Sequence, residues 1–126
     1  MTSLKEMGMP YHRLEVWKRA LASVKSVCEL TSSFPGEEKF GLVSQMRRAA
    51  VSVPSNIAEG SARDSRKEFV NFLHIAQGSI AELETQILVS QDLGFVDKDT
   101  SSSLRTELDE ISKMIIGLQK SLRRHM

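Results

Sequence analysis

Four polar residues in the middle third of the chain are spaced like one side of a helix. They follow one another at intervals of four, four and three residues: Arg48, Ser52, Asn56 and Glu59. Side chains at such intervals stack along a helix. A cation, a hydroxyl, an amide and a carboxylate in one row can form a hydrogen-bonded network, which Glu82 can join from a neighbouring helix. Because buried charge is normally paired, we expect a network that fixes helix register or a subunit contact. The alternative is a small-ligand site or an unrecognised enzyme centre formed by Arg48, Asn56, Glu59 and Glu82.

No other cluster of residues predicts a reaction. A di-metal site in a helical bundle needs Glu-x-x-His pairs, and His12, His74 and His125 each lack a carboxylate three residues earlier. Cys28 is the only cysteine, which excludes an intrachain disulfide, and on its apolar stripe it is expected to pack as a small hydrophobe. The glycines are isolated and form no phosphate-binding loop. We therefore expect no enzymatic activity, no metal and no cofactor.

Basic residues suggest binding rather than catalysis. The formal net charge is only +1, so a nucleic-acid site requires local clustering or repetition in an oligomer. The candidate residues are Arg47, Arg63, Arg66 and Lys67. Acidic residues are interleaved with them, so a solvated mixed face is the alternative. No aromatic residues alternate with these cations, and we expect contacts to the RNA or DNA backbone with little sequence preference.

The elements that would position these residues are four long helices. Apolar residues recur with helical rather than strand periodicity over residues 12–33, 37–59, 65–93 and 98–124. Ser65 and Glu68 form a capping box at the start of the third helix. Pro54 lies inside the second helix, where we expect a kink; the alternative is a stop near Val53 followed by a restart.

Four such segments with short joints predict an all-α protein, an antiparallel up-down-up-down four-helix bundle. We expect one domain over residues 1–126, with residues 1–11 as a flexible N-terminal tail. Small residues on the second helix, including Ala49 and Ser52, are expected to face Gly78 and Ser79 on the third. No secretory signal or membrane-spanning stretch is present, which favours the cytoplasm and no membrane partner.

Several phrases resemble one bacterial family. They are LEVWKRA (14–20), FPGEEKFGL (34–42), QMRRAAVSVPSNIAEG (45–60), SRKEFVNFLHIAQGS (65–79) and ELETQ (82–86). The chain resembles the four-helix bundle family associated with intervening sequences of large-subunit ribosomal RNA genes. The similarity covers about residues 11–94, and the fourth helix matches only in general character.

This resemblance implies a ring-like homopentamer without established enzymatic activity. It also implies kinship in fold with accessory proteins of diversity-generating retroelements, which are basic, bind nucleic acid and partner a reverse transcriptase. The near-neutral charge of this chain departs from those basic proteins. We expect a non-catalytic, homo-oligomeric scaffold with a basic surface for RNA or DNA.

Overall fold

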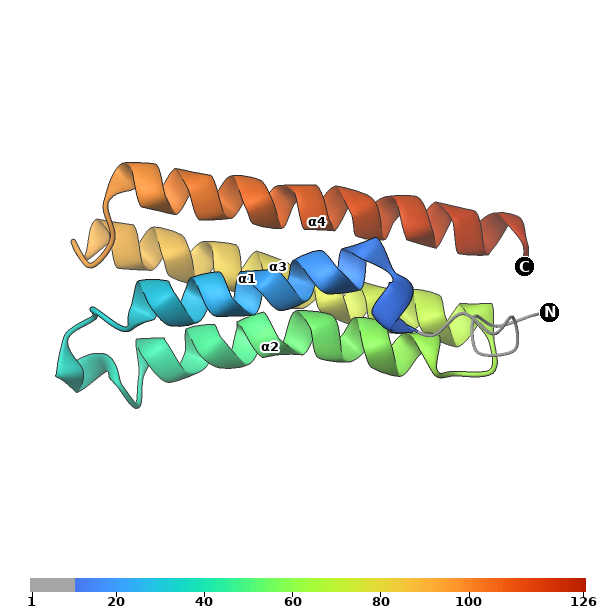
Figure 1. Cartoon of the computed structure of the whole chain (residues 1–126), viewed down its shortest axis with the longest axis horizontal. Helices are drawn as coiled ribbons and strands as arrows, with labels where there is room; N and C mark the ends of the chain where they lie inside the picture. The colour runs from blue at the N-terminus through green and yellow to red at the C-terminus, as the bar shows by residue number, and fades with distance from the viewer. Residues whose placement is uncertain (1–10) are drawn as a thin grey trace.

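The computed structural model describes residues 11–126, and four α-helices account for most of them: α1 (Glu15–Thr31), α2 (Leu42–Ser61), α3 (Arg66–Asp92) and α4 (Lys98–Arg124). Figure 1 shows the helices side by side along one long axis, with consecutive helices running in opposite directions. The predicted all-α four-helix bundle is confirmed, and residues 11–126 contain no strand. Of the predicted tail, residues 1–10 lie outside the described part, and Tyr11 opens a short 3₁₀-helix, η1 (Tyr11–Arg13).

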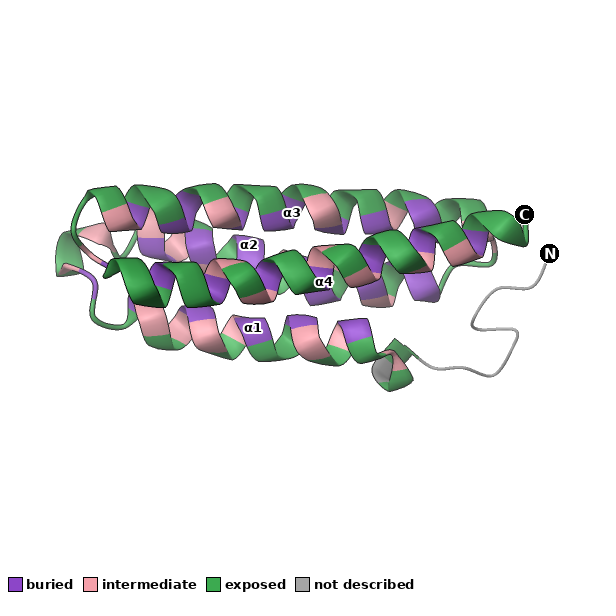
Figure 2. Ribbon diagram, turned by 90° about the horizontal axis from the view of Figure 1, so that it is seen from above, coloured by how far each residue is buried: buried purple, intermediate pink, exposed green. Residues whose placement is uncertain are grey.

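The apolar repeats of the sequence form most of the core, but Leu21 and Phe40, which belong to them, are exposed. Figure 2 shows buried residues on the inward side of each helix and exposed residues on the outside. The two longest helices, α3 and α4, supply the largest share of the fully buried side chains, which are Leu73, Ile80, Leu83, Ile87, Leu108, Ile111 and Ile115. Together with the buried Ala76, the residues within each helix are spaced by three and four, which is the seam pattern of helices that cross at shallow angles. Among residues 11–126, no helix is long and apolar enough to cross a membrane.

Two helices begin later than the periodicity predicts. Tyr11–Arg13 forms η1, so α1 starts at Glu15. A second 3₁₀-helix, η2 (Gly36–Glu38), precedes α2, which starts at Leu42 after the non-helical Gly41. The start of α3 is closer to prediction. Ser65 Oγ accepts a hydrogen bond from the Glu68 amide at 3.1 Å, which begins α3 as the capping box predicts.

The helices α2 and α3 approach closely at Gly60, whereas Gly78 has open space beside it. A Cβ added at Gly60 would lie 2.6 Å from Phe72 Cβ and 2.9 Å from Phe69 Cδ1. One added at Gly78 would meet nothing within 4 Å, so the prediction that Gly78 faces α2 is wrong. Ser79 does face α2, because its hydroxyl lies 2.8 Å from that of Ser52. The helix α2 continues without a break through Pro54, which is buried, so the alternative of a stop and restart is wrong.

Candidate nucleic-acid interface

The predicted polar row lies on the outer side of α2, next to α3, and only part of it is bonded across the two helices. Ser52 Oγ contacts Ser79 Oγ at 2.8 Å, and Asn56 Nδ2 donates to the Ser52 carbonyl at 2.8 Å and to Ser52 Oγ at 2.9 Å. These half-buried groups satisfy one another and tie α2 to α3. The contact fixes the register of the two antiparallel helices. Residues before Ser52 on α2 therefore lie level with residues after Ser79 on α3.

The charged members of the row are exposed. Glu59 pairs with Arg63, four residues later, at 3.1 Å, and Glu82 accepts from Gln86 Nε2 at 3.3 Å. Arg48 makes no hydrogen bond or ion pair with any other residue between 11 and 126. The structure therefore brings Ser52 and Asn56 together but leaves Arg48, Glu59 and Glu82 open to solvent.

Arg47 lies on α2, and its side chain binds the C-terminal end of α1. Its Nε donates to Thr31 Oγ1 at 3.0 Å and its Nη2 donates to the Cys28 carbonyl at 3.3 Å. The carbonyls of a last helical turn lack partners within the helix, and a cation stabilises that negative end. Arg47 lies near the start of α2, whereas Arg63 follows its last residue, so the length of α2 separates Arg47 from the other predicted binding residues.

Arg63, Arg66 and Lys67 lie at the joint between α2 and α3, beside the last turns of α4 (Figure 1). Arg66 Nη1 donates to the carbonyl of His125 at 3.4 Å, which connects the joint to the C-terminal end of α4. Arg123 Nη2 lies 3.0 Å from His74 Nε2, and a neutral imidazole can accept at that nitrogen. We call the cations of these segments the basic end: Arg63, Arg66, Lys67, Lys120, Arg123 and Arg124.

Within the basic end, Arg63 is paired with a carboxylate, whereas three other cations form no ion pair with residues 11–126. Arg63 is held by Glu59, and its guanidinium lies 4.8 Å from the centre of the Phe72 ring. Lys67, Lys120 and Arg124 are exposed, and none of them forms an ion pair within residues 11–126. The acidic side chains on the same segments are Glu59, Asp64 and Glu68, so cations predominate. The spacing of residues along the sequence does not identify the α4 cations as binding residues. The predicted antiparallel order of the helices could have done so, because it places the end of α4 beside the α2–α3 joint.

The opposite end of the bundle is acidic. It contains the joint between α1 and α2 and the joint between α3 and α4 (Figure 1). The acidic residues there are Glu29, Glu37, Glu38, Asp92, Asp97 and Asp99, and they outnumber the cations Lys39, Arg47 and Lys98. Asp97 caps α4, because its carboxylate accepts from the Thr100 amide at 2.8 Å, and this hydrogen bond lowers the pKa of the carboxyl. A near-neutral chain therefore has its charge separated along its long axis.

Among residues 11–126, the hollows between helices include the following. The first, of about 470 Å³, separates α1 from α4 and is lined partly by Glu29, Asp99 and Glu107. Within residues 11–126, no group of three or more histidine, cysteine, aspartate or glutamate residues could hold a metal ion. The second, of about 240 Å³, is polar and includes Glu84 and Asp109. Burial and the nearby Asp109 carboxylate raise the pKa of Glu84.

The third hollow, of about 280 Å³, lies between α1 and α2 and is mostly apolar. Its lining residues are Tyr11, Trp17, Leu21, Val24, Val51, Pro54, Ser55 and Ala58. None of the three hollows is lined by Arg48, Asn56, Glu59 or Glu82. The alternative of a ligand site around those four residues therefore gains no support from these hollows.

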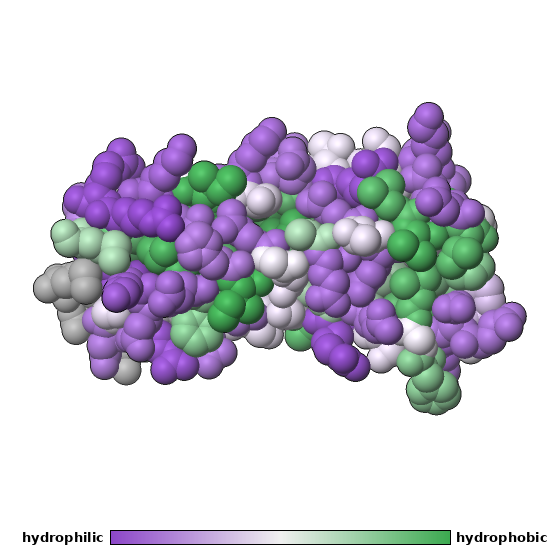
Figure 3. Space-filling view, turned by 180° about the vertical axis from the view of Figure 1, so that it is seen from behind, coloured by the Kyte–Doolittle hydropathy of each residue, from purple (hydrophilic) through white to green (hydrophobic). Residues whose placement is uncertain are grey.

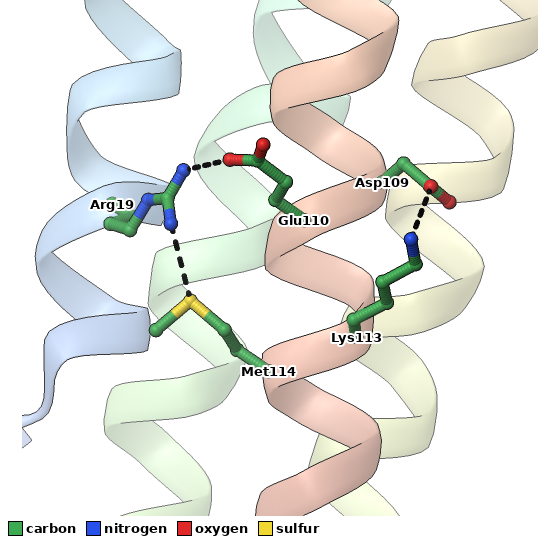
Figure 4. A network of polar contacts seen from close by, with 5 residues as sticks. All are labelled: Arg19, Asp109, Glu110, Lys113 and Met114. Atoms are coloured by element: carbon green, nitrogen blue, oxygen red, sulfur yellow. Dashed lines mark hydrogen bonds and ion pairs between the residues drawn. The ribbon is translucent and has the colours of Figure 1, made fainter.

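The pair α1 and α4 is joined by polar contacts as well as by the core. Figure 4 shows Arg19 on α1 between Glu110 and Met114 on α4. Arg19 Nη2 donates to the Glu110 carboxylate, and Nη1 lies 3.7 Å from the Met114 sulfur. Lys113 pairs with Asp109 on its own helix at 3.4 Å. The Arg19 contacts join α1 to α4, whereas the Lys113–Asp109 pair lies within α4.

Comparison with known proteins supports the fold and places the chain among relatives. A family model described as "23S rRNA-intervening sequence protein" matches residues 12–117. A crystal structure from Bacteroides thetaiotaomicron, described as a protein with unknown function from the S23 ribosomal protein family, is similar with a TM-score of 0.77 and 25% identity. The similarity covers 83% of this chain and 98% of the other. The comparison with curated proteins found no match.

Proposed function

Since the chain belongs to the 23S rRNA-intervening sequence protein family, we propose that it is a non-catalytic scaffold that assembles with copies of itself, as a homopentamer, in the cytoplasm. In this proposal each subunit contributes its basic end to a surface that holds RNA or DNA by the phosphate backbone. The observation that carries the proposal is the convergence of cations from the α2–α3 joint and the end of α4, although the net charge is only +1.

Phosphate contacts need cations that are not already neutralised, and Lys67, Lys120 and Arg124 are exposed without an ion pair in the described chain. One subunit offers only a few such contacts, so binding by a monomer would be weak at physiological salt. Assembly repeats the basic end and raises the effective local concentration of cations around a bound nucleic acid. Self-association and nucleic-acid binding are thereby linked in one function.

The test compares two variants that remove the same charge from different parts of the bundle. Lys67→Ala with Lys120→Ala removes cations from the basic end, while Lys98→Ala with Lys113→Ala removes two elsewhere. Fluorescence anisotropy with a single-stranded RNA and a DNA duplex, titrated at low and moderate salt, measures the affinity. We expect the first variant to bind more weakly, with a salt slope about one unit flatter for each protein–phosphate ion pair that the substitutions remove from the assembly.

The control variant should bind like the original protein. Equal weakening in both variants would indicate attraction by net charge alone and would contradict a localised site. Absence of binding by the original protein at low salt would eliminate the nucleic-acid part of the proposal. The reverse transcriptase partner implied by the resemblance remains a prediction, and copurification from cells followed by mass spectrometry tests it.

A further inference from the structure

The described residues form two apolar surfaces that contain exposed side chains. The first, the apolar prominence, consists of Phe40, Val89 and Leu93, which are 90%, 42% and 56% exposed. Phe40 lies just before α2, and Val89 and Leu93 lie at the end of α3. The Ser52–Ser79 contact sets the register that brings these ends level. Figure 3 shows hydrophobic side chains gathered at this end of the molecule, on the face opposite to that of Figure 1.

The second surface is the α1–α2 hollow described above. Leu21 and Val51, one from each helix, are 48% and 47% exposed on its walls. Trp17 also lines it, and its ring lies edge-on to that of Tyr11 with 5.2 Å between centres. An exposed aromatic prominence and an apolar hollow on one chain are chemically suited to pack against each other, and aromatic side chains are enriched at interfaces.

The charges around the two surfaces are of opposite sign. Glu37, Glu38 and Asp92 lie near the prominence in sequence, with Lys39 as the one nearby cation among the described residues, whose ammonium lies 5.6 Å from the centre of the Phe40 ring. Beside the hollow, Lys18 and Lys25 follow two of its lining residues on α1, and Arg48 lies one turn before Val51 on α2; all three are exposed. Two carboxylates also adjoin the hollow: Glu59 is paired with Arg63, and Glu15 precedes Trp17 by two residues, so cations still predominate. Complementary charge of this kind orients association.

We propose that the apolar prominence of one subunit docks into the α1–α2 hollow of a second copy of this chain. The inference rests on the proposed self-association and specifies its interface. Two different patches in contact make a heterologous interface, and only such an interface closes an odd-numbered ring. Lys67, Lys120 and Arg124, the exposed cations of the basic end without an ion pair among residues 11–126, belong to neither surface.

A complementation experiment tests the proposal. Phe40→Ser with Leu93→Ser removes the prominence and leaves the hollow, whereas Leu21→Glu with Val51→Glu spoils the hollow and leaves the prominence. All four side chains are exposed, so both variants should fold, which circular dichroism checks. Analytical ultracentrifugation should find each variant monomeric alone and a two-chain complex in the mixture, because one intact surface remains on each. Ile116→Ser, on the exposed side of α4, is the matched control and should assemble like the original protein.

Trp17 supplies an independent signal, because it is the only tryptophan and lines the hollow. Acrylamide should quench it less in the assembled protein than in the Phe40→Ser, Leu93→Ser monomer. Equal protection in that monomer would contradict the proposal and would point to coverage of the hollow by the chain itself. If the original protein is monomeric, the proposed self-association fails; if it assembles but either double variant still assembles alone, or the mixture does not associate, this interface is wrong.

Discussion

Polar side chains tie α2 to both of its neighbours: Ser52 contacts Ser79 on α3, and Arg47 bonds to the last turn of α1. The interval from Ser52 to Asn56 correctly predicts that both lie on one side of α2, and Ser79 completes the contact from α3. Arg47 could not be assigned from the sequence, because its role depends on the position of the end of α1, which is set by tertiary packing. The local sequence around an arginine that follows or precedes another arginine on a helix looks the same in both cases. Such an arginine can bind phosphate or cap a neighbouring helix.

The role of Arg47 gives a first prediction. Arg47→Ala should lower the free energy of unfolding by about 1–3 kcal/mol, because the substitution removes charged hydrogen bonds to the last turn of α1. Arg48→Ala is the control, since Arg48 is exposed and should change stability by less than about 0.5 kcal/mol. Urea unfolding followed by circular dichroism measures both. A stable Arg47→Ala variant with impaired nucleic-acid binding would restore Arg47 to the binding site.

Glu84 predicts a pH dependence. Its pKa is raised in the folded protein, first by burial and then by the Asp109 carboxylate. The folded state therefore binds the Glu84 proton more tightly than the unfolded state does. The stability that this provides is fully present below the ordinary pKa of 4.5, and it is lost as the pH rises through the higher pKa of the folded protein. Glu84→Gln should be more stable than the original protein at neutral pH, and this advantage should disappear in acid. Urea midpoints measured across that pH range would contradict this account if the two proteins remained parallel.

At the scale of helices, the apolar repeats were sufficient to predict four elements, their order and most of their core residues. The first residues of α1 and α2 were predicted less accurately from the sequence. The residues of η1 and η2 are mostly polar, so the apolar repeat does not mark where α1 and α2 begin, and 3₁₀ turns are frequent at helix ends. Gly60 and Gly78 were also indistinguishable from sequence, because their different surroundings depend on how closely α2 approaches α3.

Gly60 and Gly78 form a matched pair of tests for that packing. Gly60→Ala should destabilise the protein by about 1–3 kcal/mol, because the new methyl group would overlap Phe72 and Phe69. Gly78→Ala should stabilise it by up to about 1 kcal/mol, since its position in α3 is exposed and open. Thermal and urea unfolding of both variants provide the comparison. Equal effects of the two substitutions would contradict the close approach at Gly60.

For the whole molecule, net charge was a poor guide to surface charge. The antiparallel order of the helices collects Arg63, Arg66 and Lys67 with the last residues of α4, and it gathers the acidic residues at the other end. This separation follows from topology, so residue types taken in chain order predict only the part contributed by the α2–α3 joint. The same topology leaves an apolar prominence and an apolar hollow on different parts of one subunit.

The central claim is that this chain works as an assembly of identical subunits. Native mass spectrometry of the purified protein at micromolar concentration, with sedimentation equilibrium in solution, tests the claim most directly. We predict one dominant species with five times the 14.1 kDa mass of the chain. A species of 14.1 kDa alone, at concentrations well above those in a cell, would contradict the claim.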